Sequence, residues 1–202
     1  MKKIAILTAF LFGSIYARAS DPYSAYMHSV RQHQIAPGLK NFAEECGYTI
    51  EGNRPLYGVN LNDKWKRTKD PTRSSPDEAT DFFSTAEIWL QNGKSRIVNI
   101  WSIGGGELHL MYCLDTESRV RFIESSYVMI PDDPSVVGWV YERRFSVNAT
   151  EKLTLVRSAF RNLQGQRIAI PKMAPEDKKS LHEMPDIKLP AQVIAAVVPS
   201  RR

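Results

Sequence analysis

The chain has 202 residues, of which 43% are hydrophobic and 24% charged, with a formal net charge of +5. Acidic and basic residues are mixed along it, which argues against a nucleic-acid-binding protein, because such proteins gather Lys and Arg into a patch or stripe. The length is sufficient for one domain with a hydrophobic core.

The N-terminus has the pattern of a secretory signal peptide. Two lysines precede an apolar run over residues 4–16, and the small-residue motif Ala17-Arg18-Ala19 follows. The run is shorter than the ~20 residues of a membrane-spanning helix, so we expect cleavage after residues 1–19 rather than an anchor. Cleavage removes three cations and no acid, which lowers the formal charge from +5 to +2. The mature chain is expected in the periplasm or outside the cell.

Two short helices are expected next. Asp21-Pro22 has the residues of a helix start, because Asp caps the N-terminus and Pro suits the first helical position. Pro37 starts a second helix, which ends at Gly47. This second helix carries one apolar stripe, formed by Leu39, Phe42, Ala43 and Cys46. Cys46 is therefore expected to face the core.

The segment from Gly38 to Ile50 combines this helix with a glycine and a β-branched strand (Gly38-Leu39-Lys40-Asn41-Phe42-Ala43-Glu44-Glu45-Cys46-Gly47-Tyr48-Thr49-Ile50). It resembles the helix-then-strand unit of the short N-terminal domains of secretins and TonB-dependent receptors. The resemblance covers about a dozen residues and implies a possible place among envelope machinery.

Residues 62–81 are polar and mixed in charge. Lys64, Lys66, Arg67, Lys69 and Arg73 form a basic cluster around Trp65. The cluster belongs either to an anion-binding loop or to a solvated connection. The second interpretation is favoured, because connecting loops are polar and exposed in general.

Four alternating runs between Thr85 and Ile130 predict two β-hairpins. The first turns at Asn92-Gly93, a dipeptide that suits the positive φ angles of a type I′ turn. A two-residue turn predicts the pairs Gln91 with Lys94, Trp89 with Arg96, and Ile88 with Ile97. One face then carries Ala86, Ile88, Leu90, Ile97, Asn99, Trp101 and Ile103.

Gly104-Gly105-Gly106 predicts a tight reversal into the second hairpin, because no helix follows to form a phosphate loop. Strands over 107–114 and 119–130 flank a loop over 115–118. This register pairs Cys113 with Val120, Met111 with Phe122, and His109 with Glu124, all on one face.

Further strands are expected at 139–147, 152–160 and 167–170. The fold class is therefore α+β, with two short N-terminal helices packed on a meandering antiparallel sheet of about five to seven strands. A curled sheet or partial barrel is the alternative, since it would remove the exposed edges. The single domain covers residues 20–170. Residues 171–202 form a proline-rich extended or disordered C-terminal arm with an apolar patch at 193–198.

The two cysteines, Cys46 and Cys113, are expected to form a disulfide, because each lies on an apolar face of its element in an exported chain. No metal site is expected, since His28 and His33 are five positions apart and point to different sides of a helix. No cofactor is expected either.

Two hypotheses of function remain. The first is non-enzymatic binding of another envelope or secreted macromolecule, without nucleic acid, through the arm or through Arg96, Tyr112 and Arg121 on the exposed sheet face. The alternative is a small hydrolase-like enzyme in which Glu124 orients His109 as a general base. No nucleophile motif accompanies that pair, so binding is preferred.

Overall fold

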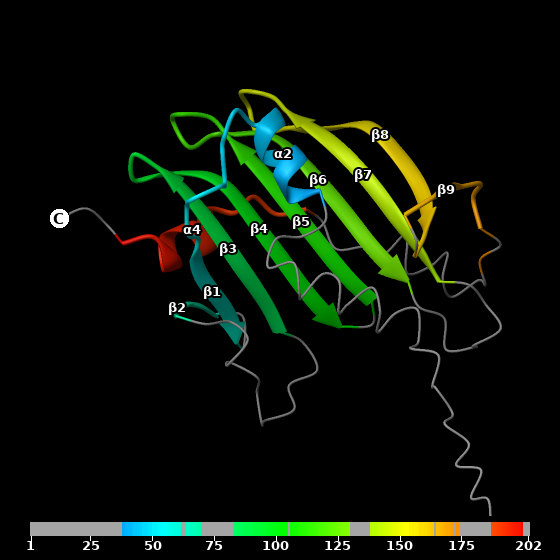
Figure 1. Cartoon of the computed structure of the whole chain (residues 1–202), viewed down its shortest axis with the longest axis horizontal. Coiled ribbons are helices and arrows are strands. Elements are labelled where there is room, and N and C mark those ends of the chain that lie inside the picture. Colours follow the sequence, from blue (N-terminus) through cyan, green and yellow to red (C-terminus); the bar gives the residue numbers. More distant parts are fainter. Residues whose placement is uncertain are drawn as a thin grey trace, which may run out of the picture.

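A computed structural model of the chain describes residues 38–61, 64–69, 83–104, 106–129, 138–163, 165–171, 173 and 187–199. These residues form one antiparallel sheet of nine strands in the order β2-β1-β3-β4-β5-β6-β7-β8-β9, with two helices against it (Figure 1). The sheet is open, with β2 and β9 at its edges. The predicted antiparallel meander is confirmed, with more strands than the five to seven expected.

The elements have the following bounds. The strands are β1 (Leu56–Leu61), β2 (Lys64–Thr68), β3 (Phe83–Gln91), β4 (Lys94–Gly104), β5 (Gly106–Leu114), β6 (Val120–Met129), β7 (Trp139–Val147), β8 (Leu153–Asn162) and β9 (Arg167–Ile168). The helices are α2 (Leu39–Glu45) and α4 (Ala191–Val197).

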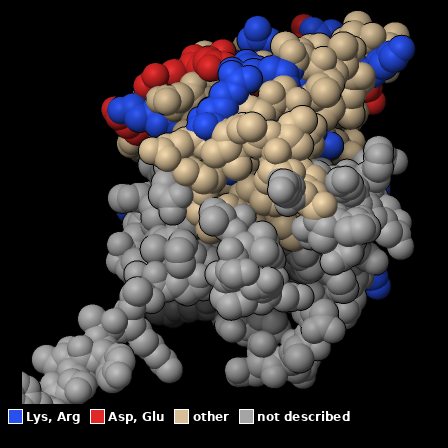
Figure 2. Space-filling model, turned by 90° about the vertical axis from the view of Figure 1, so that its right-hand side faces the viewer, with Lys and Arg blue, Asp and Glu red and all other residues tan. Residues whose placement is uncertain are grey.

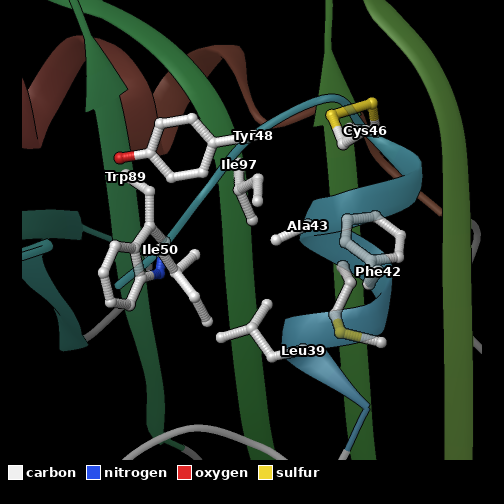
Figure 3. Close-up of a cluster of buried hydrophobic side chains, with 10 residues drawn as sticks. Leu39, Phe42, Ala43, Cys46, Tyr48, Ile50, Trp89 and Ile97 are labelled. Carbon is white, nitrogen blue, oxygen red and sulfur yellow. A yellow bond between two sulfur atoms is a disulfide. The ribbon is translucent and has the colours of Figure 1, made fainter. Parts of the chain in front are cut away.

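Helix α2 lies on the side of the sheet that we call the front face (Figure 3). Its apolar stripe packs on Trp89, Ile97 and Met111, and these side chains form one buried cluster. The helix ends where Gly47 takes a φ of 71°, a left-handed conformation that glycine adopts without a steric penalty. The amide of Tyr48 then donates to the carbonyl of Ala43 at 2.8 Å, which closes the end of the helix. The second predicted helix is confirmed; the first, over residues 21–34, lies outside the described residues.

The disulfide between Cys46 and Cys113 is confirmed. It joins the end of α2 to β5 across a Cα–Cα distance of 5.6 Å, and both residues are buried. Disulfides are typical of compartments outside the cytoplasm. No helix in the described part of the chain is long and apolar enough to cross a membrane.

Helix α4 lies on the opposite side, the back face. The helix lies against β1, β2 and β3. Val193 and Val197, one helical turn apart, belong to a buried cluster that also includes Ile88, Val98 and Tyr112. The hydroxyl of Tyr112 also donates to the carbonyl of Lys188 at 2.8 Å. The end of the predicted C-terminal arm is therefore a helix docked on the chain's own sheet, because its apolar patch repeats at helical spacing.

A β-bulge corrects the predicted register of the first hairpin. Gln91 pairs with Lys94 as expected, but Leu90 pairs with Ser95 and Trp89 with Ile97. Arg96 is thus an extra residue in β4, and the predicted pairs Trp89 with Arg96 and Ile88 with Ile97 are wrong. Because of the extra residue, each residue of β4 after Arg96 shares a face with the opposite set of β3 residues from the one predicted. Ile97, Asn99 and Trp101 share the front face with Trp89 and Glu87, not with Ile88.

A second bulge corrects the second hairpin. Leu114 pairs with Val120, but Cys113 pairs with Phe122, Met111 with Glu124 and His109 with Ser126. The predicted pairs are each wrong by two positions, so the residues keep their face but change their neighbours. The turn contributes to the shift, because Asp115 and Arg119 close it by a backbone hydrogen bond of 2.9 Å.

Two other expectations have clear outcomes. Residues 64–68, which we expected in a polar connection, form the edge strand β2. The large apolar side chain of tryptophan predicts that at least two of the four tryptophans are buried, and Trp89 and Trp139 are.

Removing the disulfide should destabilise the fold. The double substitution Cys46→Ala with Cys113→Ala releases a loop of sequence separation 67. Loop-closure entropy then predicts that the free energy of unfolding falls by about 4 kcal/mol. Urea unfolding followed by circular dichroism measures this loss, and an unchanged midpoint would contradict it.

Packing of α4 should depend on Gly58 in β1. A Cβ atom at this position would lie 2.5 Å from Cγ2 of Val197, so close that one of the two residues must shift. Gly58→Ala should therefore lower the free energy of unfolding by about 1–3 kcal/mol. Val197→Ala should relieve the clash, so the double variant should lose less than the sum of the single losses; strict additivity in urea unfolding would contradict this contact.

Candidate binding cleft on the front face

An open cleft of about 560 Å³ lies on the front face beside α2. It extends from β4 and β5 across β6 to β9. Residues that define it include Glu45 on α2, Trp101 and His109 on β4 and β5, Glu124 and Ser126 on β6, Glu142 and Arg144 on β7, Arg157 and Arg161 on β8, and Arg167 on β9.

A ladder of ion pairs forms the wall of the cleft next to α2. Glu124, Arg144 and Arg157 are neighbours on adjacent strands. Oε1 of Glu124 accepts from Nη1 of Arg144 at 2.9 Å and from Nη2 of Arg157 at 2.7 Å. Nη1 of Arg144 also lies 2.5 Å from Oε2 of Glu45. The ladder therefore connects the end of α2 to three strands.

Arg144 also packs on an aromatic ring of the sheet. Its guanidinium lies 4.3 Å from the ring centroid of Phe122, within the range of a cation–π interaction. Phe122 in turn contacts Phe42 of α2 edge to face, with centroids 5.1 Å apart. Arg144 is thus fixed by packing and charge together.

The far wall of the cleft carries a second ion pair and free positive charge. Nε of Arg161 donates to Oε2 of Glu142 at 2.6 Å. Arg167, opposite Arg161 in β9, has no carboxylate partner among the described residues. Five arginines and three glutamates line the cleft, so its net charge is positive.

A chain of polar side chains extends from the floor of the cleft into the core. Nδ2 of Asn99 donates to Oε2 of Glu87 at 3.2 Å, and Oδ1 of Asn99 bonds to Nε2 of His109. Because the amide nitrogen of Asn99 faces Glu87, its oxygen faces His109, which places the imidazole proton on Nε2. His109 also stacks on Trp101, with ring centroids 5.2 Å apart.

Burial shifts both titratable ends of this chain. It raises the pKa of Glu87 to about 7, although the hydrogen bond from Asn99 opposes the shift. It lowers the pKa of His109 to about 4. Both shifts have the same origin, since a medium of low polarity disfavours the charged form of either group. His109 is therefore neutral at pH 7.

The structure does not pair His109 with Glu124 as the sequence predicted. The imidazole bonds to Asn99, whereas the Glu124 carboxylate bonds to two arginines. Only Nδ1 of His109 is left to accept a proton, and the low pKa makes it a weak base at neutral pH.

Two of the three predicted binding residues are buried. Arg96, the bulge residue, is 6% exposed, and its Nη2 donates to the carbonyl of Cys46 at 3.0 Å. Tyr112 is 1% exposed beneath the C-terminal segment. The sequence predicted that some of the three are exposed; the bulge buries Arg96 and the docked arm covers Tyr112. Arg121 is exposed as expected.

Sequence reasoning missed the arginines of β7, β8 and β9. Glu142 and Arg144 lie two positions apart in β7, and this spacing already predicts a polar face there. The pairing of β7 with β8, which places Arg144 beside Arg157, has no local signal.

The described residues contain no group of His, Cys, Asp and Glu side chains that could hold a metal ion. Comparisons of the chain with protein-family models, curated proteins and solved structures give no match.

The buried pair of titratable groups should give opposing pH dependences of stability. The raised pKa of Glu87 stabilises the fold below pH 4.5, and this contribution is lost as the pH rises through 7. The lowered pKa of His109 stabilises the fold above pH 6.5, and this contribution is lost as the pH falls through 4. Between these limits the two effects oppose each other.

Glu87→Gln should remove one of the two effects. In this variant the free energy of unfolding should increase more steeply with pH than in the parent chain. Between about pH 4 and 6.5 the variant should gain up to about 3 kcal/mol more than the parent chain does. Urea unfolding at several pH values measures this slope, with the exposed Glu44→Gln as control. A slope equal to that of the parent chain would contradict the assignment.

Proposed function

We propose that the protein is exported and acts as a non-enzymatic binding protein for another envelope or secreted macromolecule. It holds an acidic part of that partner in the front-face cleft. The export signal in the sequence and the disulfide support the compartment.

The observation that carries this proposal is the arrangement of arginines across the cleft. The side chain of Arg157 is 65% exposed although it contacts Glu124, and Arg167 is exposed as well. Arginine forks bind carboxylates through paired hydrogen bonds and are common at interface hot spots. The glutamates of the cleft already have arginine partners, so the positive charge in excess is available to a ligand.

Binding is favoured over hydrolysis by the state of His109. A general base at neutral pH needs a pKa near the working pH and a free ring nitrogen aimed at the substrate. The pKa of His109 is about 4, and its Nε2 is bonded to Asn99. The open shape of the cleft also suits a segment of a macromolecule that lies across it.

Charge reversal in the cleft should abolish binding. We expect the mature chain to capture a partner by cross-linking in the exported fraction of its source cells. The double variant Arg157→Glu with Arg161→Glu should no longer capture that partner. The reason is that the cleft changes from net positive to net negative, while both positions are exposed enough to leave the core intact.

Arg121→Glu is the control for each single reversal, because it makes the same Arg-to-Glu substitution at an exposed residue outside the cleft. Capture that survives the double reversal, or that Arg121→Glu reduces equally, would contradict the proposal.

A further inference from the structure

Strand β8 is covered along only part of its outer edge. It has ten residues, but β9 pairs only with Phe160 and Arg161. From Leu153 to Ser158 its outer side faces no strand in the part of the chain that the structure describes. Thr154 to Ser158 are also exposed on both faces of the strand.

We propose that this free edge of β8 binds an extended, acidic segment of the partner protein as an added β-strand. The inference rests on the proposed function and names the mode by which the partner binds. Addition of a strand supplies main-chain hydrogen bonds for affinity, while the side chains of alternate residues supply specificity.

The backbone of β8 presents donors and acceptors for such a strand. The amide of Asn162 donates outward to Gln166 at 2.9 Å in the turn before β9. Because hydrogen-bonding direction alternates along a strand, the amides of Phe160 and Ser158 point to the same outer side. Phe160 is opposite Ile168 in β9, whereas Ser158 lies beyond the end of β9.

Exposed apolar side chains lie at this edge. Leu155 is 51% exposed and Val156 is 61% exposed, and Ile170, which follows β9, is 78% exposed. These are the large hydrophobic side chains that are most exposed in the described part of the chain. A docked strand would remove part of this surface from water.

Positive charge at the same edge selects an acidic partner. Arg157, Arg161 and Arg167 lie on β8 and β9. In the described part of this side, basic side chains cross uncharged residues, with an acidic group beside them (Figure 2). A second copy of the chain, pairing β8 with β8, would bring like charges together, which destabilises cross-strand contacts. An acidic segment instead meets each arginine with an opposite charge.

The edge also has features that prevent indiscriminate pairing. A bulge interrupts the pairing of β7 with β8 between Arg144 and Phe145, and arginines project beside it. Bulges and charges are common devices against edge-to-edge aggregation. The partner strand must therefore supply carboxylates, which makes the edge selective.

The experiment measures binding of a fluorescent synthetic peptide of alternating valine and glutamate to the mature chain. A matched peptide of alternating valine and lysine is the control. We expect saturable binding of the first peptide only, with amide shifts in β8 detected by NMR. Absence of binding by the valine–glutamate peptide, or equal binding of both, would overturn the proposal.

Ser158→Pro tests the main-chain contact, because proline removes an outward-pointing amide that β7 does not use and is tolerated at an edge. It should weaken peptide binding about tenfold or more, whereas Ser158→Ala should leave it unchanged. Val156→Glu, at an exposed position, should weaken binding by repulsion even if the proline variant unfolds. Equal binding by Ser158→Pro, Val156→Glu and Ser158→Ala would overturn strand addition.

The outcomes separate this inference from the proposed function. If charge reversal at Arg157 and Arg161 abolishes capture of the cellular partner while Ser158→Pro leaves peptide binding intact, the cleft binds without strand addition. Self-association in ultracentrifugation that Ser158→Pro abolishes would show that a second copy occupies the edge, which also overturns the proposal.

Discussion

The cross-link between Cys46 and Cys113 is the constraint on which the front face depends. Helix α2 has seven residues, too few to be stable alone, since isolated helices need roughly 12–15 residues. Its position follows from burial of its apolar stripe and from the covalent bond to β5. Because α2 is fixed there, Glu45 reaches Arg144 and the ion-pair ladder has a first member. The cleft is therefore a consequence of where the disulfide holds the helix.

The same face shows how polar groups are arranged in a protein interior. Glu87, Asn99 and His109 enter from three adjacent strands and satisfy one another by hydrogen bonds. Burial disfavours the charged form of Glu87 and of His109, which makes His109 a weak base at neutral pH. The arginines nearer the sheet edge are partly solvated and keep their charge. The binding that we propose therefore depends on the outer strands β7 to β9, while the inner strands form the floor of the cleft.

The sequence predicted the parts of this fold that have local signals. The apolar stripe of residues 39–46 and the Asn92-Gly93 turn follow from residue chemistry at short range. The pairing of Cys46 with Cys113 could be predicted because the chain has only two cysteines. The bulges at Arg96 and after Cys113 do not, because an extra residue in an alternating run leaves no mark in the pattern. The docking of Val193 and Val197 was hidden by the prolines around them. His109 and Glu124 were placed on the correct face, but their partners depend on pairing between strands distant in sequence.

Hydrogen exchange measured by mass spectrometry, on the oxidised chain and on the reduced, alkylated chain, tests most directly whether the disulfide holds α2 as the wall of the cleft. The account predicts that reduction removes protection from residues 39–48, whereas β3 to β6 keep theirs, since the sheet has its own core with α4 on the back face. Unchanged protection of α2 after reduction, or simultaneous loss across the whole sheet, would contradict it.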